Sequence, residues 1–405
     1  MNRMAKWLVK HRVVVVIICL LLMIPSIMGM TATKVKYDLL YYLPQDLDTV
    51  KGQEILMEDF GKGAFSLCLT EGMTEAAQAG LEEAVRQVPH VESVIGYASI
   101  LRGALPAEIL PDEVREVFQK EDTRLMAVFF DETSSAEGTM EAIETIRRIA
   151  GERCFVSGLS AVVTDTKALV EEQEGIYVAI AVALCCLVLM MTMDSFLLPL
   201  IFLCCIGVSI LWNMGSNCFF GEISYITKAV AAVLQLGVTL DYSIFLWHSY
   251  NEQRTLHADK NEAMAVAIHD TLTSVLGSSI TTVAGFISLC FMSFTMGKDL
   301  GVVMAKGVLF GVLGCVTVLP ALILVLDKPL QKTKHRSLLP KMEKLSKRIV
   351  KIFPIFLVIF ALVIPPALYG YDRTNDEVYY DMGECLPQSG GGARTGGGSV
   401  DRAVG

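Results

Sequence analysis

Residues 236–245 read Leu-Gly-Val-Thr-Leu-Asp-Tyr-Ser-Ile-Phe and place one carboxylate, Asp241, inside an apolar run from Ala229 to Ser249. About 20 apolar residues are needed to cross a hydrocarbon core of roughly 30 Å, and this run is long enough. A charged side chain at the centre of a span costs about 2.5–3.5 kcal/mol on insertion scales, so an intramembrane acid is by default a functional residue. The stretch therefore predicts a membrane-spanning helix that carries a functional carboxylate.

Six other apolar runs have a similar length, so the chain is predicted to cross the membrane seven times. The seven runs are Val13 to Met30, Ile176 to Met193, Phe196 to Trp212, Ala229 to Ser249, Thr271 to Phe294, Leu300 to Leu326 and Ile352 to Gly370. The charged fraction of 19% agrees with this, because soluble domains are closer to a quarter charged. The predicted fold class is a membrane α-helical bundle.

The distribution of charge predicts the orientation of the spans. Lys6, Lys10 and Arg12 precede the first run, and the loop 328–351 is also rich in Lys and Arg. In the stretch Val35–Glu174, acidic residues outnumber basic ones. Because Lys and Arg gather in cytoplasmic loops, we expect a cytoplasmic N-terminus, an uncleaved first span and a location in a bacterial cytoplasmic (inner) membrane.

Between the first two spans the periodicity becomes that of a small extracytoplasmic α+β domain. The expected strands are Ala64–Thr70, Val91–Tyr97, Arg124–Asp131 and Cys154–Ser157, and the expected helices are Thr74–Val88, Pro111–Lys120, Ser135–Ala150 and Ser160–Glu172. The order β-α-β, repeated once, fits a split βαβ (porter-like) sandwich, although other α+β arrangements share this pattern. Cys68 and Cys154 both fall in this domain, but without the spacing of a disulfide framework.

A repeat suggests that the seventh span begins a second copy of the first part. Tyr37-Asp38 and Leu43-Pro44-Gln45 follow the first span, and Tyr380-Asp381 and Leu386-Pro387-Gln388 follow the seventh. The glycine-rich residues after Ser389 have the composition of a flexible linker, and are interpreted as a frameshift, a fragment end or an appended tail. The expected segments are 1–30, 31–175, 176–327, 328–351, 352–370 and 371–405.

The candidate site centres on Asp241 and Tyr242. Burial in the membrane favours the neutral form of a carboxyl group, which suits Asp241 to take up and release a proton, and the phenol of Tyr242 lies beside it. Gly237, one turn earlier, would allow another helix to approach closely. Two interpretations of Asp241 stay open: a proton relay, or a structural acid paired with Lys228 or with a residue of a missing half.

The fifth span offers a polar face that could accompany this carboxylate. Its members are spaced as on one side of a helix: Ser274, Ser278, Thr281, Thr282 and Gly285. The hydroxyls could bond the carboxylate or hold water, but hydroxyls often only join helices in membranes, and we favour that simpler role.

Other chemistry finds little support in the sequence. Gly61-Lys62-Gly63 and Gly297-Lys298 lack the remaining residues of a phosphate-binding loop, and no Gly-x-Ser-x-Gly elbow occurs. The six histidines form no metal-binding pattern. We therefore expect no enzymatic activity, no cofactor, no metal and no nucleic-acid partner, and an energy source in an ion gradient.

Several motifs together resemble the MMPL branch of RND (resistance-nodulation-division) transporters. They are Gly237-x-x-x-Asp241-Tyr242, Thr281-Thr282-Val283-Ala284-Gly285-Phe286, Lys298-Asp299-Leu300-Gly301, Leu319-Pro320-Ala321-Leu322 and the run from Tyr37-Asp38 to Leu43-Pro44. The resemblance covers Met1 to about Gln388. It implies twelve spans in two repeats, each repeat with an outer porter domain, of which this chain holds the first half and the start of the second.

The same resemblance implies a function and partners. In this family an Asp-Tyr pair on the fourth span, with an equivalent on the tenth, carries protons that power export of lipids or other hydrophobic compounds; Asp241 and Tyr242 match the first pair. The implied partners are a hydrophobic or lipid-like substrate, protons, membrane lipids, and either further copies of the chain or a missing second half. Two rival functions stay open: a lipid sensor with a sterol-sensing-like bundle, and an accessory subunit of protein export.

Overall fold

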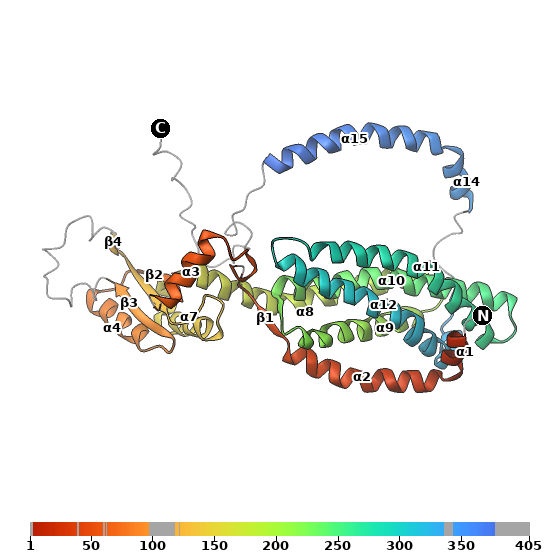
Figure 1. Ribbon diagram of the computed structural model, residues 1–405, viewed down its shortest axis with the longest axis horizontal. Helices are drawn as coiled ribbons and strands as arrows, with labels where there is room; N and C mark the ends of the chain where they lie inside the picture. Colours follow the sequence, from red (N-terminus) through yellow and green to blue (C-terminus); the bar gives the residue numbers. More distant parts are fainter. Residues whose placement is uncertain are drawn as a thin grey trace. The chain divides into compact units, whose positions relative to one another are not determined.

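The computed structural model describes residues 3–38, 40–59, 61, 63–96, 118–120, 122–335 and 343–376. The chain divides into two compact units, Met1–Leu338 and Leu339–Gly405. The first unit holds a helical bundle and an αβ domain, which is inserted between helices α2 and α8 (Figure 1). The second unit holds α14 (Glu343–Lys351) and α15 (Phe353–Asp376).

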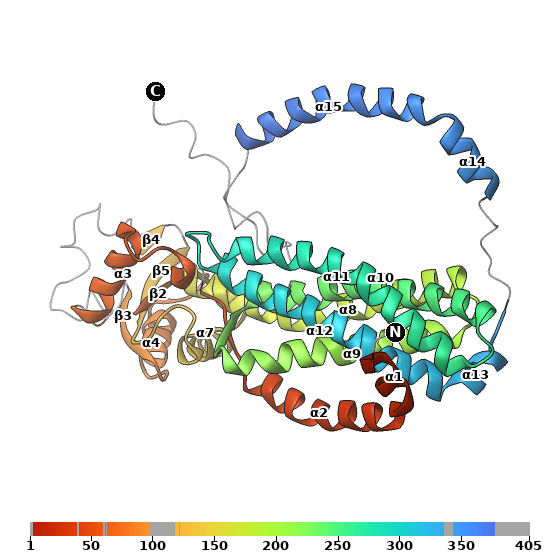
Figure 2. The same cartoon turned by 45° about the vertical axis from the view of Figure 1, so that its right-hand side comes forward.

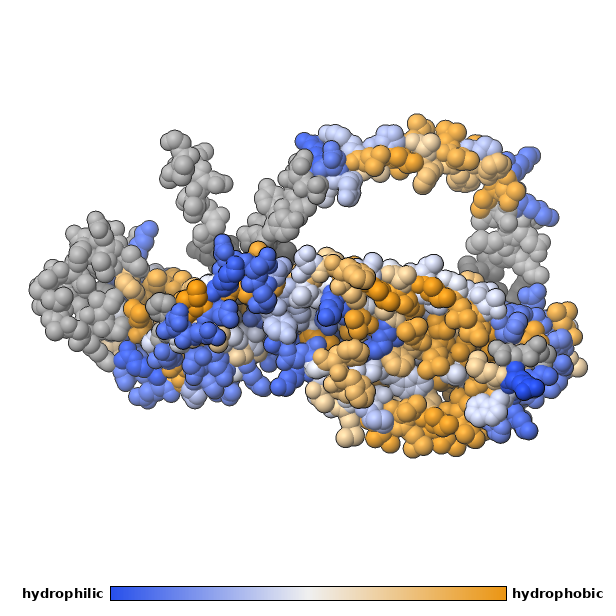
Figure 3. All heavy atoms as spheres, in the orientation of Figure 1, coloured by the Kyte–Doolittle hydropathy of each residue, from blue (hydrophilic) through white to orange (hydrophobic). Residues whose placement is uncertain are grey.

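Seven helices of the described residues are long and apolar enough to cross a membrane, which confirms the seven predicted spans. They are α2 (Arg12–Ala32), α8 (Leu159–Thr192), α9 (Leu197–Gly215), α10 (Tyr225–Leu256), α11 (Lys260–Leu289), α12 (Met296–Val325) and α15. Apolar residues cover the bundle and hydrophilic residues cover much of the αβ domain (Figure 3). The predicted fold class, a helical membrane bundle with a small α+β domain, is thus correct.

Helices α9 and α12 form the centre of the bundle. In the apolar segment of each helix, 61% of the residues of α9 and 67% of those of α12 are buried. The corresponding share is 11% for α2 and for α11, and 6% for α8. Helix α12 approaches α10 closely because it has glycines at the contact: a Cβ on Gly307 would lie 3.0 Å from Oε1 of Gln235, and one on Gly311 would overlap Thr239. Much of the outer surface of α2, α8 and α11 is left for lipid or for another protein surface.

The two ends of the bundle differ. The αβ domain lies at one end, which we call the domain end, and α1 (Arg3–Lys10) lies at the other, the far end (Figure 2). At the domain end, β1 (Lys34–Lys36) pairs in parallel with β7 (Glu222–Ser224), which leads directly into α10. Ser224 caps α10, because its hydroxyl accepts a hydrogen bond from the backbone N–H of Ile226. This short sheet ties the end of α2 to the start of α10.

The αβ domain has the predicted split βαβ topology. Its strands β2 (Ala64–Glu71), β3 (Val91–Gly96), β5 (Thr123–Phe130) and β6 (Cys154–Ser157) follow the order β3-β5-β2-β6, and every neighbouring pair is antiparallel. Helices α4 (Glu75–Arg86) and α7 (Glu137–Ala150) connect β2 to β3 and β5 to β6. Strands β2 and β3 are therefore parallel to each other with β5 between them, as a split βαβ unit requires.

One face of this sheet packs against the helices and the other carries exposed apolar side chains. Cys68, Met126, Val128 and Phe130 are buried with residues of α7 in the core, because alternate residues of a strand face opposite sides. Phe65, Leu69 and Phe155 are exposed on the other face.

Two sequence-based predictions about this domain need comment. Most of the expected helix Pro111–Lys120 lies outside the described residues. The helical prediction is wrong for its last two residues, because Gln119–Lys120 form strand β4, which pairs with β5. A disulfide between Cys68 and Cys154, for which the sequence offered no framework spacing, is not formed; both thiols are free and buried. The second Leu-Pro-Gln motif and the glycine-rich tail also lie outside the described residues.

Candidate functional site

Asp241 lies near the middle of α10 and faces outward. Helix α10 begins at Tyr225, so a rise of 1.5 Å per residue places Asp241 roughly 24 Å along it. The side chain is exposed, and it forms no hydrogen bond or ion pair with any residue that the structure describes. A carboxylate in an apolar span is thus turned away from its own bundle.

The same side of α10 carries other exposed residues at helical spacing. Leu234, Gly237, Phe245 and His248 are exposed like Asp241 and lie three or four residues apart along the helix. No atom approaches a Cβ built on Gly237 within 4 Å, so no helix of this unit packs there. The close helix approach predicted at Gly237 is therefore not made by the described residues of this unit.

Tyr242, the next residue, points into the bundle. It is 3% exposed, and its phenolic oxygen has no hydrogen-bond partner among the described residues. The phenol lies close to Thr282 on α11. Asp241 and Tyr242 therefore present an acid and a phenol on adjacent sides of one helix, one open and one enclosed.

The hydroxyl face of α11 is also open. Ser278, Thr281 and Gly285 are exposed, and nothing lies within 4 Å of a Cβ built on Gly285. Thr282 lies beside Tyr242 between α11 and α10, and α12 packs against both helices. The exposed hydroxyl face of α11 and the exposed Asp241 therefore both point away from α12, on the same side of the helix pair. We call Gly237, Asp241, Ser278, Thr281 and Gly285 the Asp241 face.

The structure places the predicted partners of Asp241 elsewhere. The hydroxyls of Thr281 and Thr282 donate to the backbone oxygen of Ser278, at 2.8 and 3.0 Å, and not to the carboxylate. Lys228, considered as an ion-pair partner, lies 3.1 Å from Glu174 on α8. Among the described residues, Asp241 therefore contacts neither of the partners that the sequence suggested.

Sequence reasoning missed a second polar cluster, although its spacing could have revealed it. Asp299 and Lys306 lie seven residues apart on α12, which brings them to the same side of the helix. Asp299 accepts hydrogen bonds from the N–H of Ser224 at 2.7 Å and the hydroxyl of Thr227 at 2.8 Å, at the start of α10. Lys306 donates to Oδ1 of Asn217 at 2.5 Å. Lys306 thus lies within the predicted span Leu300 to Leu326, as a second charged residue inside an apolar run.

A row of buried polar groups leads from this cluster towards Tyr242. Asn213 donates to Oε1 of Gln235 at 2.9 Å, and both side chains are almost fully buried. Gln235, Thr239 and Tyr242 follow one another at helical spacing, and the Nε2 atom of Gln235 and the hydroxyl of Thr239 lack partners among the described residues. Buried polar groups without partners are costly, so this row is a feature that packing alone does not explain.

An apolar cavity of about 540 Å³ opens at the domain end, between α2, α8, α9 and α10. Met30, Val178, Leu211 and Met214 contribute apolar walls, and the Lys228–Glu174 ion pair also lines it. Such a volume lies within the range of small-molecule sites, about 300–1,000 Å³.

A hydrogen-bonded tyrosine joins this region to the start of the αβ domain. The hydroxyl of Tyr37 lies 3.4 Å from Oε1 of Glu171, a second acid that lines the cavity. Burial, reinforced by the negative charge of Glu171, raises the pKa of Tyr37 to about 12. Its ring also stacks on that of Tyr225, the first residue of α10, with centroids 5.4 Å apart. Tyr37 therefore contacts both α8 and α10 next to the cavity.

Comparison with known proteins identifies relatives over most of the chain. The MMPL family profile matches residues 42–348. A membrane protein of Methanocaldococcus jannaschii is 23% identical over 348 residues, which are 76% of this chain and 90% of that protein. The siderophore exporter MmpL5 of Mycobacterium tuberculosis is 28% identical over 256 residues, 60% of this chain but only 26% of the exporter. A crystal structure of SecDF in its super-membrane-facing form gives a TM-score of 0.39 at 14% identity, over 80% of this chain and 39% of that one.

The matched region contains the αβ domain and the helices from α8 to α12, so it includes every residue of the Asp241 face. The chain is a multi-pass membrane protein that belongs to the MMPL family of RND-type transporters.

Proposed function

We propose that this chain belongs to a proton-driven exporter of lipids or other hydrophobic compounds, in which Asp241 and Tyr242 take up and release the proton. The observation that carries the proposal is the outward-facing carboxylate in the middle of a span. Among the described residues no cation pairs with it, and an intramembrane carboxylate of this kind is by default a functional residue.

The exposure of Asp241 requires a covering surface. A carboxylate that faced lipid at this depth would cost about 2.5–3.5 kcal/mol, and water does not reach it across a bilayer. Glycines and small hydroxyl residues surround it, and such residues allow helices to approach closely. We therefore propose that the Asp241 face packs against a second copy of the chain or against a second half, which would supply polar partners.

Helix α10 supplies a physical link between the proton site and the substrate path. The same helix carries Asp241 in the membrane, Lys228 at the cavity and Ser224 at its start, where Asp299 holds it. Helix α8 runs without interruption from the αβ domain into the membrane and carries Glu174. A shift of α10 on protonation would act on the Lys228–Glu174 pair, and hence on α8 and the cavity.

We further propose that the cavity receives the apolar part of the substrate, and that the far end of the bundle is cytoplasmic. Apolar walls at the membrane boundary suit a lipid tail or another hydrophobic group. Lys6, Lys10 and Arg12 lie at the far end, and the positive-inside rule assigns that side to the cytoplasm. The αβ domain would then be extracytoplasmic, in a bacterial cytoplasmic membrane.

Reconstitution tests the proposal. Liposomes that contain the full chain, an internal pH-sensitive dye and a fluorescent short-chain phospholipid would be given an imposed pH gradient. We expect proton movement that depends on the lipid probe, its loss in Asp241→Asn and its reduction in Tyr242→Phe. The matched control is Asp270→Asn, which replaces an exposed carboxylate in the first half of α11. This variant should behave as the unmodified chain. Coupled movement that persists in Asp241→Asn would refute the assignment.

A lipid receptor without transport is the second candidate, because the cavity alone would suffice for binding. In that case the fluorescent lipid should bind with equal affinity to the unmodified chain and to Asp241→Asn, and neither should move protons. The two functions are therefore separated by flux and not by binding.

A further inference from the structure

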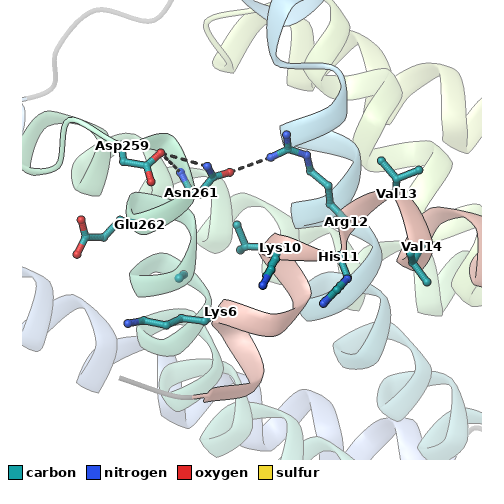
Figure 4. A pocket seen from close by; sticks show the side chains of 11 residues that line it. Lys6, Lys10, His11, Arg12, Val13, Val14, Asp259, Asn261 and Glu262 are labelled. Atoms are coloured by element: carbon teal, nitrogen blue, oxygen red, sulfur yellow. Dashed lines mark hydrogen bonds between the residues drawn. The ribbon is translucent and has the colours of Figure 1, made fainter.

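A second cavity lies at the far end of the bundle, where α1 and the start of α2 meet the start of α11. Its volume is about 660 Å³, and both basic and acidic side chains reach it (Figure 4). Lys6 and Lys10 come from α1, Arg12 from the first turn of α2, and Asp259 and Glu262 from the start of α11.

The cations of this cavity are not neutralised by its acids. Lys6, Lys10 and Arg12 form no ion pair with residues that the structure describes, and the guanidinium of Arg12 donates instead to the amide oxygen of Asn261 at 2.8 Å. The carboxylate of Asp259 is engaged in capping α11, since it accepts from the backbone N–H of Asn261 at 3.0 Å. With three cations against two carboxylates, the cavity carries a net positive charge and has donors to spare.

The cavity lies at the boundary between polar and apolar surface. Val13 and Val14, the first apolar residues of α2, line it beside the cations and are exposed. Helix α1 is amphipathic: Ala5, Leu8 and Val9 are buried against the bundle, which holds the lysines in place. A ligand here would meet charges at one end and a lipid-facing helix at the other.

The exposed tryptophan of α1 supports a position at the membrane interface. Trp7 is 52% exposed, and its ring centroid lies 5.0 Å from that of His11, another residue that lines the cavity. Tryptophan is enriched at the boundary between hydrocarbon and headgroups, and amphipathic helices with Lys and Arg lie in this plane.

We propose that this cavity binds the phosphate headgroup of an anionic phospholipid from the membrane leaflet at the far end. Lys6, Lys10 and Arg12 contact the phosphate, and an acyl chain runs along the outer side of α2 from Val13 and Val14. Basic pockets between membrane helices are suited to anionic headgroups, because charge attraction and hydrophobic contact act together there. The bound lipid would bridge α1, α2 and α11. This site is separate from the proposed proton site and does not depend on transport.

Native mass spectrometry of the full chain, released from nanodiscs of phosphatidylcholine with one fifth phosphatidylglycerol, tests the proposal. We expect one tightly retained phosphatidylglycerol, with retention roughly 20- to 30-fold weaker in Lys6→Gln/Lys10→Gln, since each basic residue contributes about a fivefold factor near a membrane surface. Both lysines are exposed, so their replacement should leave the fold intact.

The control is Lys328→Gln/Lys332→Gln, which removes two exposed lysines outside the cavity. Equal loss of phosphatidylglycerol in this control would overturn the proposal, because general surface charge would then explain the binding. Equal retention in Lys6→Gln/Lys10→Gln would overturn it as well. Displacement of the lipid by millimolar inorganic phosphate would assign the cavity to a free phosphate compound and not to a lipid.

Discussion

The contact between α10 and α12 makes a sharp prediction at Gly311. A Cβ at this position would lie 3.2 Å from Cγ2 and 3.3 Å from Cβ of Thr239, and closer still to Oγ1. Both residues are buried at the centre of the bundle, where neighbouring helices leave little room to yield. Gly311→Ala therefore overpacks this contact, which costs about 1–3 kcal/mol.

Helix propensity works in the opposite direction, so a matched control is needed. Alanine favours a helix interior by about 1 kcal/mol over glycine. Gly277→Ala, on α11 and outside the Asp241 face, has the same propensity gain and meets no atom within 4 Å. The difference between the two variants therefore isolates the overpacking cost of about 1–3 kcal/mol.

The assay is the thermal unfolding midpoint of the detergent-solubilised chain, followed by intrinsic fluorescence. We expect Gly311→Ala to unfold several degrees below Gly277→Ala, and Thr239→Ala to restore much of the loss when combined with Gly311→Ala. Equal midpoints for the two glycine variants, or no recovery in the double variant, would refute the proposed contact.

Three further predictions concern the domain end of the bundle and the αβ domain. Lys228→Glu should lower the unfolding midpoint slightly, because the pair with Glu174 is only partly buried, and Glu174→Lys added to it should restore the midpoint. The raised pKa of Tyr37, about 12, means that the stability it contributes is complete below pH 10 and is lost between pH 10 and 12; Tyr37→Phe should flatten the alkaline unfolding profile in this window. Ile146→Ala, in the fully buried core, should destabilise the αβ domain by about 2–5 kcal/mol, as measured by proteolysis of that domain.

Much of the fold could be predicted because its signals are local. Strand β2 begins at Ala64 as expected, and helix α7 ends at Ala150 as expected, because alternation and helical periodicity are strong there. Helices α8 and α10 extend beyond the expected spans, since polar residues can continue a helix after it leaves the membrane. Hydropathy detects only the part of a helix that crosses the membrane.

The candidate site could be predicted only in part. The sequence located Asp241 and the hydroxyl spacing on α11, but it could not decide that these residues face out of the bundle, because this depends on how α12 packs. The Asp299–Ser224 and Lys306–Asn217 contacts were missed because they join residues far apart in sequence. Lys228 was considered for Asp241, but its partner, Glu174, lies on another helix.

The most direct measurement of the central claim is infrared difference spectroscopy of the full chain in lipid nanodiscs, with isotope-labelled aspartate, as the pH is lowered. The account predicts that, within the pH range of this titration, a protonated carboxyl band appears reversibly, is absent in Asp241→Asn and persists in Asp270→Asn. A spectrum in which Asp241 stays ionised through this range, or one that Asp241→Asn leaves unchanged, would contradict it.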